Sequence, residues 1–353
     1  MSESTTDTGN PVQEALDAAR RETEAARGLT ADPDGLATCL LHQSGYAAVA
    51  GEIAESRACL EEARGIYQGL GRFPEVARCL LLLARLARSE KAPQKAQEQL
   101  DLSLWLFRQL GDVGGQAEVL LEAGEMALAE ERLDRAEDWF LQAQRRFHEA
   151  GQTRREIDAL KAAALARQFA GSFIHALRLF EEALGLAREL PDPAQVLEIT
   201  LALGGLQTQV GERRQARLLL QEARELARQQ EAPDKEVLAL THLATLEASL
   251  DRLKEAEQLA DEARRLAAEA VDVPGYLLAV VVLTQVHQAA GDDVACLEVL
   301  FRASNGLADL LGEPGRQPMQ ELLTTLRKAW GEERYTRSLK RYIAIRQAAS
   351  QLS

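Results

Sequence analysis

The chain has 353 residues and a formal net charge of −14, and 46% of its residues are hydrophobic but only 5% are aromatic. So many apolar residues exclude a wholly disordered chain, and so few aromatic ones disfavour a β-sandwich or barrel. The excess of negative charge argues against nucleic acid as a partner, because affinity for phosphate groups needs positive charge.

Cysteine usage and the lack of long apolar segments indicate the cellular compartment. The four cysteines include no C-x-x-C pair, and the longest apolar run, 276–283, is far shorter than the roughly 20 residues of a membrane helix. The first ten residues lack the apolar core of a signal peptide. We therefore expect a soluble, cytoplasmic protein without membrane insertion. Arginine supplies 34 of the 41 basic residues, a bias that favours a GC-rich bacterial source.

The first thirty residues fall into two predicted parts. Residues 1–10 are polar and are expected to be disordered. Residues 11–30 are expected to form a single N-terminal capping helix. Asn10 is a suitable N-cap residue, and Pro11 suits the first helical position.

Residues 31–310 are dominated by a repeat of forty residues. Small residues occupy one column of this repeat, at Ser44, Ala84, Gly124, Ala164, Gly204, Ala244, Thr284 and Thr324. A bulkier column follows sixteen positions later, at Leu60, Leu100, Phe140, Phe180, Leu220 and Leu300. Such columns predict helices that approach closely at the small residues and bury the large ones between them.

Proline and glycine divide each copy into helix, tight turn and helix. Seven of the ten prolines lie at the start of a copy, where a first helical turn tolerates them. Gly171 and Gly211 are typical of the turn inside a copy. In the third copy we expect the first helix, helix A, near 116–130 and the second, helix B, near 133–149. The glycines just before residue 116 are assigned to a loop, and seven copies of this unit fill residues 31–310.

Residues 311–353 are expected to form a divergent eighth copy that ends in a C-terminal capping helix. Thr336, Lys340 and Ile343 interrupt three of the columns. The last helix is rich in basic residues, as suits a solvated end of a repeat array. Its predicted apolar face consists of Tyr335, Leu339, Tyr342 and Ile343.

The third copy carries the pattern of a known repeat family. The matching residues are Leu120, Ala123, Gly124, Ala127, Ala136, Phe140 and Ala143. This order of large residue, small residue and glycine, followed by alanine, an aromatic residue and alanine, resembles the tetratricopeptide repeat in its longer-helix variant. The resemblance implies an all-α fold, a right-handed α-solenoid of about eight helix-turn-helix repeats. It also implies that helix A lines a concave face on which ligands lie.

Residues for catalysis or metal binding do not come together in the sequence. Cys39 and His42 share a helical face, but a structural zinc site needs four ligands. The glycines at 111–115 are not followed by the Gly-Lys-Ser/Thr of a phosphate-binding loop. We therefore predict that the protein is not an enzyme and uses neither a cofactor nor a metal.

Basic residues line the predicted inner surface in the second copy. The spacing of Arg78, Arg85 and Arg88 places them on one face of helix A. They either bind an acidic group of a partner or form exposed pairs, worth about 0–1 kcal/mol each, with glutamates of the next helix A. Those glutamates are Glu118, Glu122 and Glu125.

Uncharged polar residues line the same surface in later copies. The candidate partner-binding residues there are Gln168, Gln209, His242, Thr245, Gln285 and Gln288. Their side chains either hydrogen-bond the backbone of an extended peptide or only solvate the wall of the solenoid.

These observations predict a protein-interaction scaffold or adaptor that binds a peptide segment or helix of another protein on the concave helix-A surface. The alternative is a regulatory protein that senses a small ligand or signalling peptide, as bacterial regulators with similar repeats do. Since only thirty residues precede the repeats, we expect its output to come from a separate partner. The sequence leaves open whether the chain forms homo-oligomers.

Overall fold

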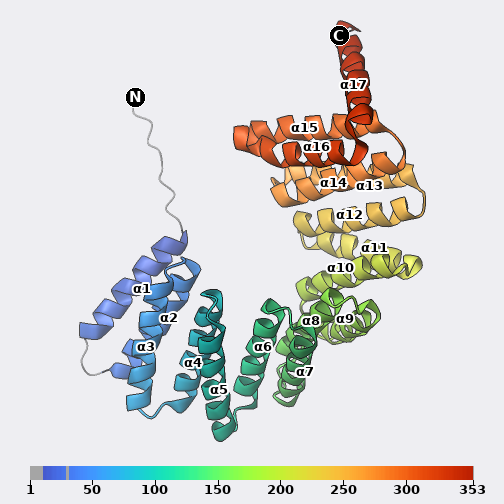
Figure 1. Cartoon of the computed structure of the whole chain (residues 1–353). Coiled ribbons are helices and arrows are strands. Elements are labelled where there is room, and N and C mark those ends of the chain that lie inside the picture. Colours follow the sequence, from blue (N-terminus) through green and yellow to red (C-terminus); the bar gives the residue numbers. More distant parts are fainter. Residues whose placement is uncertain (1–10, 29–31, 353) are drawn as a thin grey trace, which may run out of the picture. The chain divides into compact units, whose positions relative to one another are not determined.

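The computed structural model describes residues 11–28 and 32–352, which form 17 α-helices, one short 3₁₀ helix and no strand (Figure 1). They divide into two compact units, one that ends at Leu179 and one that begins at Phe180. The expected disorder of residues 1–10 and the expected N-cap at Asn10 lie outside the described residues. Within the described ranges, no helix combines the length and the apolarity that crossing a membrane requires.

The helix bounds follow the forty-residue period. The N-terminal unit contains α1 (Pro11–Gly28), α2 (Pro33–Val49), α3 (Ile53–Gly69), α4 (Phe73–Ser89), α5 (Pro93–Leu110), α6 (Val113–Ala129), α7 (Leu133–Glu149), α8 (Thr153–Phe169) and the first residues of α9 (Phe173–Arg188). The C-terminal unit contains the rest of α9, α10 (Pro193–Val210), α11 (Arg213–Gln229), α12 (Pro233–Ser249), α13 (Leu253–Glu269), α14 (Val273–Ala289), α15 (Asp293–Leu311), the 3₁₀ helix η1 (Glu313–Arg316), α16 (Gln317–Trp330) and α17 (Glu332–Leu352).

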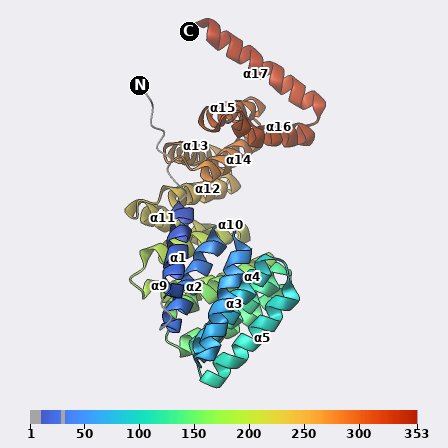
Figure 2. The same ribbon diagram turned by 90° about the vertical axis from the view of Figure 1, so that its left-hand side faces the viewer.

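Consecutive helices of each unit pack side by side as hairpins (Figures 1 and 2). The first helices of successive hairpins also contact one another: α4 contacts α6, α6 contacts α8, α10 contacts α12, and α12 contacts α14. Since every other helix is thus aligned, each unit has a surface formed by first helices, which we call the helix-A face. The β-branched segment Val280–Val282 lies within α14.

The two residue columns found in the sequence meet inside the hairpins. A methyl group added at Gly124 in α6 would lie 2.5 Å from the ring of Phe140 in α7. One added at Gly204 in α10 would lie 2.8 Å from Leu220 in α11. Phe140 and Leu220 are both fully buried. The small residue on helix A therefore makes room for the large residue that follows on helix B, which confirms the prediction from the columns.

The prediction for the start of helix A in the third copy is wrong by one turn. Helix α6 begins at Val113 rather than near 116, because Asp112 caps it by accepting a hydrogen bond of 2.8 Å from the Gly115 backbone N–H. A Cβ at Gly115 would lie 2.3 Å from the ring of Phe107. This glycine, assigned to a loop in the sequence, is required for close packing of the first helical turn. The predicted bounds of α7 agree with the structure.

The terminal helices differ from the rest. Helix α1 occupies the predicted capping segment up to Gly28. In α17, Tyr335, Leu339 and Tyr342 pack against the core, as expected, but Ile343 is exposed. The predicted apolar face is one residue too long at Ile343, because this residue points to a different side of the helix from Tyr342, which stacks on Phe301.

The turns of the repeat require a left-handed backbone conformation. Inside the hairpins, positive φ angles recur every forty residues, at Gly51, Lys91, Glu131, Gly171, Gly211, Asp251, Gly291 and Gly331. In the turn between α13 and α14 the corresponding residue is Val271, with a φ of 56°. A β-branched residue is strained in this region, because its Cβ crowds the following carbonyl oxygen.

We expect Val271→Gly to stabilise the protein by about 1 kcal/mol, since glycine removes this strain and the side chain is 62% exposed. Urea unfolding of the C-terminal unit within the whole chain measures the change. Val271→Ala serves as the control, because it shortens the side chain but keeps a Cβ. Equal stability of the two variants would show that the turn is not strained.

Candidate functional site

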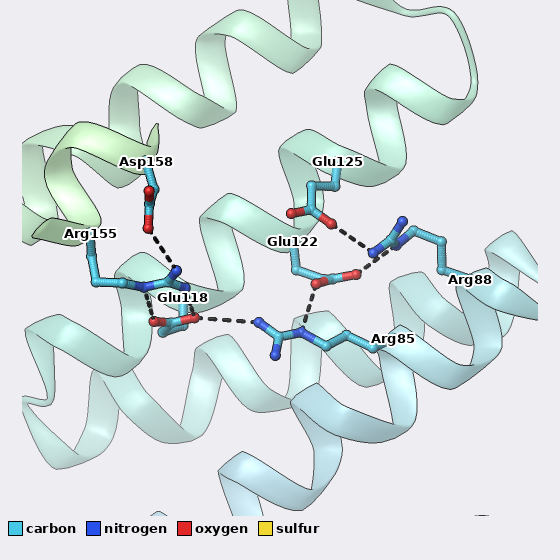
Figure 3. A network of polar contacts seen from close by, with 7 residues as sticks. All are labelled: Arg85, Arg88, Glu118, Glu122, Glu125, Arg155 and Asp158. Carbon is cyan, nitrogen blue, oxygen red and sulfur yellow. Dashed lines mark hydrogen bonds and ion pairs between the residues drawn. The ribbon is translucent and has the colours of Figure 1, made fainter. Parts of the chain in front are cut away.

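The helix-A face of the N-terminal unit is crossed by a network of charged side chains (Figure 3). Its centre is Glu122 on α6, which is only 3% exposed. Arg85 and Arg88 on α4 both donate through Nε to this carboxylate, at 2.8 and 2.7 Å. The two guanidinium groups thereby neutralise a buried negative charge, which would otherwise be costly to desolvate.

The network continues on both sides of Glu122 (Figure 3). Arg88 also donates to Glu125 at 2.6 Å. Arg155 on α8 donates two hydrogen bonds to Glu118, at 2.8 and 2.6 Å, and one to Asp158 at 3.2 Å. Three successive first helices are therefore connected by charge-assisted hydrogen bonds.

The arginines predicted from the sequence have different environments. Arg85 and Arg88 are paired with glutamates, as one of the two alternatives expects. The pairs are less exposed than that alternative assumed, because Glu122 is buried. Arg78 is exposed and makes no ion pair within the described residues. Gln168 on α8 is half-buried on the same helix-A face.

Arg155 was missed by the sequence analysis, although a signal for it exists. The pairs Arg85–Glu122, Arg88–Glu125 and Glu118–Arg155 all have a sequence separation of 37 residues. This separation is one repeat less one helical turn, which brings a long side chain from one helix A over the next. Searching for opposite charges at this separation would have found Arg155.

Burial also affects the outermost glutamate of the network. Desolvation raises the pKa of Glu125 above its ordinary value, and the negative charge of Glu122 adds to this effect. The positive charge of Arg88 opposes the shift. Around Glu122, the helix-A face of the N-terminal unit is thus a set of mutually satisfied charges, and Arg78 lies outside this set.

The helix-A face of the C-terminal unit is uncharged at the predicted positions. Gln209 on α10, Thr245 on α12 and Gln285 on α14 are exposed, while His242 and Gln288 are half-buried. The Thr245 hydroxyl donates to the Thr241 carbonyl oxygen within its own helix, at 2.9 Å. On this face, the amides of the glutamines and the imidazole of His242 therefore remain free to donate a hydrogen bond to a ligand.

A cavity of about 270 Å³ lies between α14 and α16, beside two of these glutamines. Its polar rim is formed by Gln285, Gln288 and Thr325, and it is otherwise lined mainly by aliphatic side chains. Those residues are Val281, Leu300, Leu322, Leu326 and Ala329. The sequence identified the glutamines but not the wall from α16, because the repeat columns are interrupted in the last copy.

No family model and no curated protein sequence matches the chain. Solved structures do resemble it. A signal transduction ATPase with numerous domains (STAND) protein with a tetratricopeptide-repeat sensor, from Pyrococcus horikoshii, is among them. It matches 98% of this chain and 55% of its own, with 14% identity and a TM-score of 0.58. The chain has the tetratricopeptide-repeat fold.

Two further structures share this fold. BtubC from P. vanneervenii is 18% identical and has a TM-score of 0.56, over 63% of this chain and 93% of its own. The apo form of the quorum sensor NprR from B. thuringiensis is 14% identical and has a TM-score of 0.55, over 89% of this chain and 98% of its own. The predicted all-α solenoid class is thereby confirmed.

Two cysteines of the chain occupy packing positions. Cys79 and Cys296 are buried and free, and burial raises their thiol pKa values to about 11 and about 12. Among the described residues, no three His, Cys, Asp or Glu side chains are grouped so that they could hold a metal ion.

His242 lies against the neighbouring repeat. A Cβ at Gly205 on α10 would be 3.1 Å from its imidazole, so this glycine gives the ring its space. Burial lowers the pKa of His242 below its ordinary value of 6.5. The ring has no side-chain hydrogen bond within the described part of the chain.

We expect Glu122→Gln to destabilise the protein by about 2 kcal/mol, because two arginines lose a charged hydrogen-bond acceptor. Glu125→Gln is the matched control, since Glu125 is 42% exposed and accepts one bond, and it should cost less than about 1 kcal/mol. Urea unfolding at neutral pH measures both values. Similar losses for the two variants would contradict a central role for Glu122.

We expect His242 to make folding less stable in mild acid. The unfolded chain binds a proton at His242 near pH 6.5, whereas the folded chain binds it only at lower pH, so stability falls as the pH drops below about 6.5. His242→Gln should therefore lose less stability between pH 8 and pH 5 than the wild type. His42→Gln, which changes an exposed histidine, should behave like the wild type. The same pH dependence in all three proteins would rule out this role.

Proposed function

We propose that the protein is a non-enzymatic scaffold or adaptor that binds a segment of another protein on the helix-A face of its C-terminal unit. The observation that carries the proposal is the cavity of about 270 Å³ between α14 and α16. An aliphatic or aromatic side chain of the partner fills this cavity. Gln285 and Gln288 at the rim hydrogen-bond the partner's backbone, and Gln209, His242 and Thr245 line the same face toward α10.

The charges of the N-terminal unit support this choice of unit. An acidic partner at Arg85 and Arg88 would have to compete with Glu122, whose carboxylate is almost fully buried between them. Displacing it would leave a buried charge unpaired, at a cost of several kcal/mol. Arg78 and Gln168, which are not part of the network, are the N-terminal residues that a partner reaches without this cost.

A second candidate function is that of a sensor whose output comes from a separate partner. The structurally similar chains include the quorum sensor NprR and a tetratricopeptide-repeat sensor. In this case the bound segment is a signalling peptide, and it occupies the same cavity and glutamines. The two candidates differ in whether binding changes the conformation of the chain.

Selection of peptides from a random library on the purified chain tests the proposal. Ala329→Phe fills the cavity, and we expect it to lower the affinity for the selected peptides at least tenfold. The double variant Gln285→Ala, Gln288→Ala should also lower this affinity. Ala289→Phe is the control, because Ala289 is exposed on α14 but does not line the cavity.

Peptides that bind the wild type and Ala329→Phe equally well would refute binding at this cavity. Small-angle scattering with and without a selected peptide then separates the two candidates. An unchanged profile supports the scaffold, whereas a changed profile supports the sensor.

A further inference from the structure

A second cavity in the C-terminal unit contains a buried histidine without a partner. It measures about 390 Å³ and lies among α13, α14 and α15, labelled in Figure 1. His287 on α14 lines it and is only 9% exposed. The imidazole makes no side-chain hydrogen bond within the described residues. The ring nitrogens are not fully buried, so a ligand in the cavity can reach them.

The fourth copy fills the equivalent position with a charged side chain. Three copies earlier, the equivalent of His287 is Arg167, which forms an ion pair with Glu137 on the preceding second helix, thirty residues away. His175 also contacts Glu137, at 3.3 Å. The buried carboxylate of Glu137 is thus paired with Arg167 and has the His175 ring beside it.

A related ion pair lies between the fourth and seventh copies. In this pair the arginine is on the second helix and the glutamate is on the next first helix. Arg217 on α11 and Glu247 on α12 are again thirty residues apart, and they form an ion pair of 2.5 Å. Arginine and glutamate therefore connect a second helix to the next first helix at this position in two different hairpins. Each of these arginines is less than one-third exposed.

Both donor side chains are shortened in the seventh copy. His287 replaces the arginine, and Ala295 replaces the histidine, whereas Glu257 keeps the place of the carboxylate. All three residues line the cavity. The volume of Arg167 and His175 and the positive charge of Arg167 are therefore missing beside Glu257.

The other charges of the cavity are already balanced. Arg264 pairs with Asp261 at 2.7 Å, and Arg302 pairs with Glu298 at 2.8 Å. Glu257 makes no ion pair within the described residues. The cavity thus has one uncompensated carboxylate at its exposed side and one unpartnered imidazole in its buried part. Leu283 and Ala303 provide an apolar wall of the same cavity.

We propose that this cavity binds a guanidinium group carried on an alkyl chain. The guanidinium takes the place that Arg167 fills beside Glu137 in the fourth copy, and it donates to Glu257 and to the imidazole of His287. The alkyl chain packs on the apolar wall. A guanidinium suits the site better than an ammonium ion because it is planar and less strongly hydrated, with several donors in fixed directions. This site is separate from the glutamine-rimmed cavity of the proposed function.

Titration of the full-length protein with n-butylguanidinium, followed by NMR of the histidine side chains, tests the proposal. We expect a saturable shift of the His287 resonances and at least fivefold weaker binding by Glu257→Gln. Glu269→Gln on the same helix, also an exposed glutamate without an ion pair, is the control and should bind like the wild type. Free arginine and acetyl-arginine methylamide then distinguish a small-molecule ligand from an arginine within a peptide.

A second variant restores the internal arrangement. His287→Arg supplies the missing guanidinium, so we expect it to raise the melting temperature and to abolish binding of n-butylguanidinium. The absence of a saturable shift in the wild type would overturn the proposal. So would unchanged binding in Glu257→Gln, or equal affinity for n-butylammonium. These outcomes do not depend on peptide binding at the other cavity.

Discussion

The fold depends on close packing between a small residue on each first helix and a bulky residue on the second helix of the same hairpin. Gly124 with Phe140 and Gly204 with Leu220 show how strict this packing is, since even one added methyl group would overlap the neighbour. Because a hairpin cannot cover both of its apolar faces, it is stable only when it stacks on others. The forty-residue period is the consequence of this requirement in the sequence.

Repetition of the backbone does not impose repetition of the surface. In the N-terminal unit, the helix-A face carries arginines and glutamates that satisfy each other, with Glu122 buried at the centre. In the C-terminal unit, the corresponding face carries glutamine, threonine and histidine beside an apolar cavity. The first surface is occupied by its own charges, whereas the second has hydrogen-bonding groups to offer. Two faces built on one scaffold can therefore have different roles.

The repeats also provide an internal comparison for buried polar groups. Arg167 with Glu137 and Arg217 with Glu247 are ion pairs between neighbouring helices at the same separation. At the equivalent position, His287 and Glu257 line a cavity instead of meeting. The cavity has room there because the His287 side chain is shorter than that of Arg167. A departure from the repeat pattern is thus more informative about binding than the pattern itself.

The sequence by itself determined the helical class, the period, the hairpins and the packing columns, because these depend on residue size and on local backbone preferences repeated many times. It also placed Arg85, Arg88, Gln285 and Gln288 on the helix-A face. Only the tertiary structure decided that Glu122 is buried, that Arg155 joins its network, and that α16 completes a cavity beside Gln285. These features arise where long side chains or a diverged helix from different hairpins meet, and such distances are not encoded in any single repeat.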